Sequence, residues 1–88
     1  MLTGTTSTGF AWSIEEDALD DMELLDALAE IDAGRLDAVS AACLHLLGKE
    51  QRARLYDHRR DDKGRVRISA VSAELGEIIN GMRDGPKS

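Results

Sequence analysis

The 88-residue sequence lacks the features of several common classes of small protein. Its single cysteine, Cys43, cannot form an internal disulfide, so we expect a reducing, cytoplasmic location. No apolar run approaches the roughly 20 residues of a membrane span. The first ten residues lack the basic and apolar regions of a signal peptide. We therefore expect no membrane association.

Aromatic and β-branched residues are also scarce. Phe10, Trp12 and Tyr56 are the only aromatic residues, and Val, Ile and Thr are scattered. Ala, Leu, Glu and Arg, which favour helix, are frequent. A chain of this length forms one thin core, which oligomerisation or a partner would help to stabilise. The composition predicts an all-α fold.

Basic residues are absent from one long stretch. Between Ser13 and Ala33 there are nine acids and no base, whereas all 11 Lys and Arg residues follow Gly34. The net charge of −6 argues against binding to nucleic acid or to an anionic membrane, because phosphate binding needs clustered bases. We expect the acidic first helix and the basic centre of the chain to attract each other.

The spacing of the apolar residues predicts a small bundle of about four helices. The expected helices cover residues 21–33, 36–47, 49–60 and 68–82. We expect one helical domain over residues 13–83, with a flexible or extended N-terminal arm over 1–12 and a disordered tail over 84–88.

Local signals mark where these helices begin and end. Ser13 with Glu16 has the spacing of a capping box, but Asp20 or Asp21 can equally cap a later start. Gly34 stands where the first helix would stop. The second and third helices would be separated by Gly48, and the third and fourth by a polar turn ending at Gly64.

Phe10, Trp12 and Ile14 alternate with small or polar residues. This period of two predicts a short extended piece laid against the bundle. Phe10 and Trp12 would then either cap the core or form an aromatic patch offered to a partner.

The polar turn resembles a calcium-binding EF-hand loop only in part. Gly64 can take the invariant sixth position, with Asp61 at the third. Arg59 then replaces the first ligand, and Ala70 replaces the bidentate Glu at the twelfth position. We therefore expect no calcium site.

Other metal and catalytic patterns are missing as well. Cys43 and His45 are two residues apart on a helix, so they point in different directions and cannot share a metal. His58 lies beside Asp57, but no recognisable motif places a nucleophile near it. We expect no metal, no cofactor and no enzymatic activity.

Four short motifs between residues 10 and 82 have the spacing of a known family. They are Asp20-Asp21-Met22-Glu23-Leu24-Leu25, Leu46-Leu47-Gly48-Lys49-Glu50-Gln51, Leu55-Tyr56-Asp57-His58, and Asp61-Asp62-Lys63-Gly64-Arg65-Val66 followed by Val71. With these motifs the chain resembles the tail assembly chaperones of long-tailed, siphovirus-type bacteriophages or prophages. It departs from them at Arg67, near which Pro would more often open the last helix.

The resemblance implies a non-enzymatic protein of the host bacterial cytoplasm. Such chaperones bind the tape measure protein, keep this long helical chain soluble, help to recruit tail tube protein and are absent from the mature virion. A binding module of this kind needs an apolar groove, and we expect it to associate with itself. The predicted groove lies where Phe10 and Trp12 meet Ile79 and Met82. The alternative is that all four side chains fill the core.

A second hypothesis follows from charge alone. The acidic first helix is also compatible with a regulatory or antirepressor-like protein that mimics nucleic acid and occupies a basic partner surface. Salt distinguishes the two, because binding by apolar burial survives about 0.5 M salt whereas charge mimicry is screened.

Overall fold

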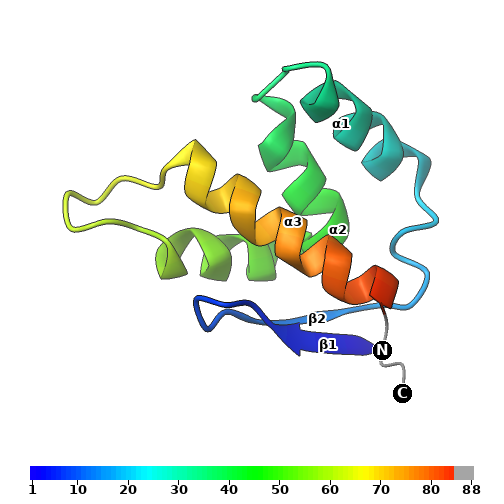
Figure 1. Ribbon diagram of the computed structural model, residues 1–88, viewed down its shortest axis with the longest axis horizontal. Helices are drawn as coiled ribbons and strands as arrows, with labels where there is room; N and C mark the ends of the chain where they lie inside the picture. The colour runs from blue at the N-terminus through cyan, green and yellow to red at the C-terminus, as the bar shows by residue number, and fades with distance from the viewer. Residues whose placement is uncertain (85–88) are drawn as a thin grey trace.

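The computed structural model describes residues 1–84, which form three helices and a two-stranded sheet (Figure 1). The elements are β1 (Leu2–Thr5), β2 (Ala11–Ile14), α1 (Met22–Asp32), α2 (Ala38–His58) and α3 (Ile68–Asp84). The prediction of an all-α bundle of about four helices was wrong, because the protein has a small α+β fold. Asp84 ends α3, and the rest of the expected tail, residues 85–88, lies outside the described residues.

The segment predicted as a flexible N-terminal arm forms an antiparallel hairpin. Leu2 pairs with Ile14, and Thr5 pairs with Ala11. Residues 1–9 have few side chains to bury, and this is why they were predicted to be mobile. Pairing with β2 gives their backbone groups partners and holds them in place. The prediction of an extended piece at residues 10–14 is confirmed by β2.

The two middle helices of the prediction are the two halves of α2, which bends at Gly48. Gly48 has φ 84° and ψ 168°, so the helix breaks there and resumes. The side chain of Gln51 bridges this break to β2. Its Nε2 donates to Leu47 O (2.9 Å) and to Ser13 O (2.7 Å), and its Oε1 accepts from Ser13 N (2.9 Å). The helix end at Gly48 is therefore confirmed, although the halves form one bent element.

Helix α1 begins and ends as its local sequence predicts. Asp21 caps it, because its Oδ1 accepts hydrogen bonds from two backbone N–H groups of the first turn. At the other end Gly34 has φ 94°. Its N–H donates to Ile31 O (2.9 Å), and the next N–H, of Arg35, donates to Glu30 O (2.8 Å), which is a Schellman motif.

The hairpin, the second half of α2 and α3 enclose much of the core, and α1 packs on the first half of α2 (Figure 1). The ring of Trp12 is buried between two glycines. A Cβ atom on Gly4 would lie 2.5 Å from Trp12 Cζ2, and one on Gly81 would lie 3.1 Å from the same atom. The absence of side chains at these two positions lets the hairpin and α3 approach the indole ring from both sides.

A buried carboxylate also fixes the hairpin to the helices. Glu74 of α3 is fully buried, and its Oε2 accepts hydrogen bonds from Thr8 Oγ1 (2.5 Å) and Arg59 Nη1 (2.6 Å). Burial raises the pKa of Glu74, but the hydrogen bonds of Thr8, Thr6 and Arg59 outweigh it and hold the pKa below its usual value. One carboxylate thus connects the hairpin turn, the end of α2 and α3.

We predict that Gly4→Ala destabilises the protein by about 1–3 kcal/mol, because the new methyl group overlaps the buried Trp12 ring. Gly76→Ala is the matched control. Gly76 is exposed in α3 with no atom near its Cβ position, so the change raises stability by about 0.5–1 kcal/mol through helix propensity. Urea unfolding measures both. Equal effects of the two substitutions would contradict the packing of Trp12 on Gly4.

We predict that Glu74 contributes stability that disappears in acid. Its folded pKa lies below its usual value of 4.5, so the contribution is fully present above about pH 4.5 and is lost as the pH falls through the folded pKa. Urea unfolding between pH 7 and pH 3 should show a smaller loss of stability for Glu74→Gln than for the wild type. An equally steep loss in both proteins would contradict this role.

Arg59→Met is expected to destabilise the protein by about 3 kcal/mol at pH 7, because it leaves the buried Glu74 carboxylate without its cation. The double substitution Arg59→Met with Glu74→Leu should recover most of this loss, since it removes the charge as well. Thermal and urea unfolding of both variants provide the measurement. A double variant as unstable as the single one would rule out the unpaired charge as the cause.

Candidate protein-binding surface

The structure places the predicted partner-binding residues in the core. Phe10, Trp12 and Met82 are 3–6% exposed, and Ile79 is half-buried against them. The face of the Phe10 ring is covered by the guanidinium of Arg54, which lies 5.2 Å from the ring centroid. The alternative, that these side chains fill the core, therefore describes the structure. A part for them in partner binding stays a prediction.

Two exposed apolar side chains, Leu36 and Ile68, lie beside a hollow between the two halves of α2 and the start of α3. Leu36 is 56% exposed and Ile68 is 55% exposed. The hollow has a volume of about 290 Å³. Its apolar lining consists of Leu36, Val39, Tyr56, Val66, Ile68 and Val71. We call this feature the α2–α3 hollow.

The bend of α2 builds one wall of the hollow. It brings Tyr56, in the second half of the helix, beside Ser40 in the first, and Tyr56 Oη donates to Ser40 Oγ (3.1 Å). Arg52 Nη1 donates to Ser40 O (3.3 Å) and Oγ (3.1 Å), and the Arg52 guanidinium lies 5.9 Å from the centroid of the Tyr56 ring. These contacts hold the two halves at a set angle.

The turn between α2 and α3 builds the opposite rim. Asp61 Oδ1 accepts from the N–H groups of Lys63 and Arg65 (both 2.9 Å), and its Oδ2 accepts from Arg67 Nε (3.2 Å). The hydrogen bond from Arg65 N–H is the main cause that holds the pKa of Asp61 below its usual value. Gly64 has φ 81°, which confirms the predicted turn. The turn fixes where Arg67 lies on the rim.

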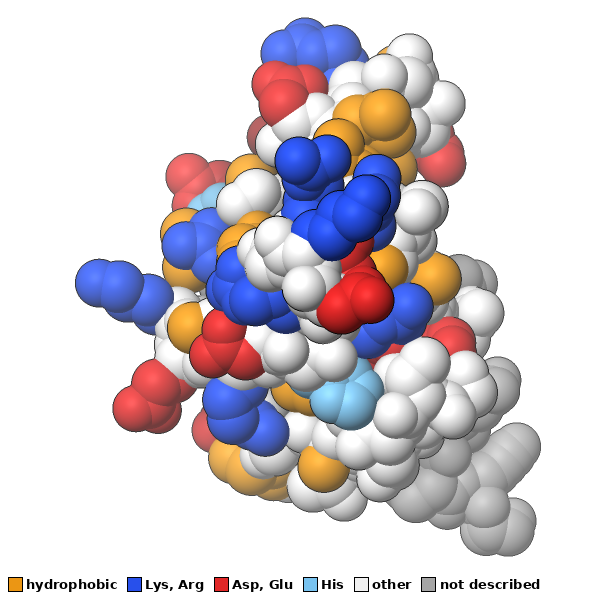
Figure 2. Space-filling view, turned by 90° about the vertical axis from the view of Figure 1, so that its left-hand side faces the viewer, with side chains coloured by type: hydrophobic (Ala, Val, Ile, Leu, Met, Phe, Trp, Pro, Cys, Tyr) orange, Lys and Arg blue, Asp and Glu red, His pale blue; other side chains and the backbone are white. Residues whose placement is uncertain are grey.

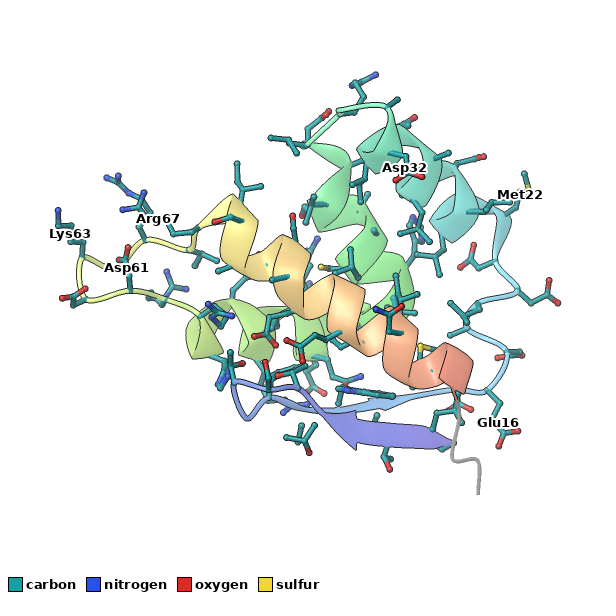
Figure 3. All side chains as sticks on the ribbon, viewed as in Figure 1. Glu16, Met22, Asp32, Asp61, Lys63 and Arg67 are labelled. Carbon is teal, nitrogen blue, oxygen red and sulfur yellow. The ribbon has the colours of Figure 1, made fainter. Side chains whose placement is uncertain are left out.

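Charge is distributed unevenly over the molecule. The nine acids of residues 15–32 and the eight bases of residues 49–67 form no ion pair with one another. The expected attraction between the acidic helix and the basic centre therefore does not take the form of ion pairs with these eight bases, and it stays a prediction. Figure 3 shows Glu16, Met22 and Asp32 far from Lys63 and Arg67, which lie at the other end of the long axis. Figure 2 shows Lys and Arg side chains gathered on the face that carries the turn.

One set of side chains offers metal-ligating atoms that the sequence did not suggest. Asp21, Glu23 and His45 each place one such atom within 4.8 Å of the others. His45 comes from α2, so only the packing of α1 on α2 brings the set together. Asp21 Oδ1 is already bonded to backbone N–H groups, and the positive end of the α1 dipole disfavours a cation here. We assign no metal to this set.

Nucleophilic chemistry is also poorly supported. Cys43 is fully buried, and burial raises the pKa of its thiol to about 11, so it is an inert core residue. Thr8 Oγ1 lies 3.1 Å from His58 Nε2, but the same hydroxyl donates to Glu74. In a catalytic triad the carboxylate orients the imidazole, whereas here it accepts the hydroxyl proton directly. The arrangement joins the hairpin turn to α2 and α3.

No helix within residues 1–84 is both long and apolar enough to cross a lipid bilayer. Comparisons with protein-family models, with curated proteins and with solved structures find no match to this chain.

Proposed function

We propose that the protein is a tail assembly chaperone of a siphovirus-type phage or prophage. In this proposal it works in the host bacterial cytoplasm, catalyses no reaction, binds the tape measure protein, helps to recruit tail tube protein and does not enter the mature virion. The sequence resemblance supports the proposal, and its motifs coincide with the cap at Asp21, the bend at Gly48 and the turn at Asp61 to Gly64.

The α2–α3 hollow is the observation on which the proposed binding role rests. Leu36 and Ile68 each leave more than half of their surface exposed beside it. At about 290 Å³ the hollow is slightly smaller than the roughly 300–1,000 Å³ typical of small-molecule pockets. An amphipathic helix can instead lay its apolar face across such a surface. Segments of a long helical client such as the tape measure protein meet this requirement.

One observation favours charge mimicry as a second candidate. The acids of residues 15–32 have few cationic partners among the described residues: Met1 N lies 3.3 Å from Glu16, and His45 lies 3.9 Å from Glu23. This leaves a strongly negative surface that a basic partner could contact. Binding through that surface depends on salt, and it does not depend on Leu36 or Ile68.

We predict that co-expression with wild-type protein keeps the neighbouring tape measure protein soluble, and that Leu36→Asp with Ile68→Asp abolishes this effect. Each Asp places a charge where the client would bury apolar surface. Both side chains are exposed, so the variant should keep the wild-type circular dichroism spectrum. The soluble fraction of the tape measure protein after centrifugation is the measurement.

Met22→Asp is the control, because Met22 is 67% exposed on α1, far from the hollow. It should solubilise the client as the wild type does. A complex that forms through apolar burial should also persist at about 0.5 M salt. Loss of the complex in salt, together with full activity of the double Asp variant, would overturn the proposal in favour of charge mimicry.

A further inference from the structure

We infer that the α2–α3 hollow selects amphipathic helices whose apolar residues are flanked by acidic residues. This inference rests on the proposed function, since it names the kind of segment that the proposed site accepts. The basis for the inference is the arginine charge beside the hollow, which is opposite in sign to the net charge of the chain.

The cation at the hollow is held in place by a hydrogen bond, and its terminal N–H groups remain available to a partner. Arg67 lines the hollow on the side of Ile68, and its guanidinium contacts Asp61 through Nε. Neither terminal nitrogen of Arg67 has a hydrogen-bond partner among residues 1–84. Arg52 does not line the hollow, but its Nη1 donates to Ser40, which does. A helix in the hollow would meet the guanidinium of Arg67 directly, and guanidinium groups bind carboxylates well.

Negative charge at the hollow is already compensated. Asp37 is the only acid that lines it, and Arg35 Nη2 contacts Asp37 Oδ2 at 3.3 Å. Asp61 lies behind the rim, where two backbone N–H groups and Arg67 use its oxygens. A basic helix would therefore find no free carboxylate in the lining and would be repelled by Arg67.

Most of the remaining acids lie away from the rim at Arg67. Residues 49–67 carry eight bases and four acids. Figure 3 shows Glu16 and Met22 on the opposite side of the molecule from Arg67, whereas Asp32, at the end of α1, is four residues from Leu36 of the hollow. Charges on exposed surfaces are screened over about 8 Å at physiological salt. The rim at Arg67 is thus locally positive although the whole chain has a charge of −6. This local complementarity determines which helices it prefers.

Three labelled helical peptides of about 20 residues test the inference, since this length spans about 30 Å. They share one apolar face, with Leu at i, i+3, i+4 and i+7, and differ only in flanking residues, which are Glu, Gln or Lys. Fluorescence anisotropy should show the Glu peptide binding about tenfold more tightly than the Gln peptide at low salt, and the Lys peptide more weakly than either. At about 0.5 M salt the three affinities should converge while binding persists.

Two variants assign the effect to the hollow. Arg67→Gln should remove most of the preference for the Glu peptide over the Gln peptide and leave the affinity for the Gln peptide unchanged. A variant that had lost its structure would bind both peptides more weakly. Leu36→Asp should weaken all three peptides about tenfold or more. Arg54→Gln is the control, because Arg54 lies over Phe10 at the hairpin and should have no effect.

The outcomes separate the inference from the proposed function. Equal binding of the three peptides that still depends on Leu36 would overturn the charge preference and leave the helix-binding site intact. Binding of the Glu peptide that Leu36→Asp does not weaken would overturn the inference, because the contact would be charge alone. Self-association at high protein concentration could also displace the peptides. That result would overturn the inference, since a second copy of the chain would then occupy the hollow. If Leu36→Asp affected neither the peptides nor the tape measure protein, both proposals would fail.

Discussion

The fold depends on the attachment of the N-terminal hairpin to the helices. A thin domain of this size has few places to bury large side chains, and the hairpin supplies Phe10, Trp12 and Ile14 to its core. The Trp12 ring determines how the hairpin packs on α3, because it fits only where Gly4 and Gly81 leave room. Glu74 also fixes the position of the hairpin, because its buried charge requires the hydrogen-bond donors that the hairpin turn and the end of α2 provide.

The attachment also determines which apolar surface remains for a partner. With the hairpin in place Phe10 and Trp12 are enclosed, and the exposed side chains Leu36 and Ile68 at the α2–α3 hollow mark the proposed binding site instead. The bend at Gly48 and the turn at Asp61 form the walls of this site, and the turn brings Arg67 to its edge. The acids of residues 15–32 and the bases of residues 49–67 form no ion pair with one another.

Local chemistry predicted the limits of the helices well, because the cap at Asp21 and the breaks at Gly34 and Gly48 depend on a few neighbouring residues. The fold class was wrong because strand β1 has no apolar pattern of its own. It exists through pairing with β2 and contact with α3, which local sequence does not encode. Glu74 was overlooked, although it stands three residues after Val71 and four before Ile78, on the buried face of α3. The hollow could not be predicted, since it depends on the angle at which α2 bends.

Fluorescence of Trp12, the only tryptophan in the chain, tests the attachment of the hairpin most directly. Its ring is 6% exposed, so the folded protein should emit at shorter wavelength than the urea-unfolded protein and should resist quenching by acrylamide. The opposite result would be a folded protein that keeps its helical circular dichroism but whose Trp12 has the same emission wavelength and the same acrylamide quenching as in the unfolded chain. That result would contradict the account. The hairpin would then be a mobile arm, and the core described above would be incomplete.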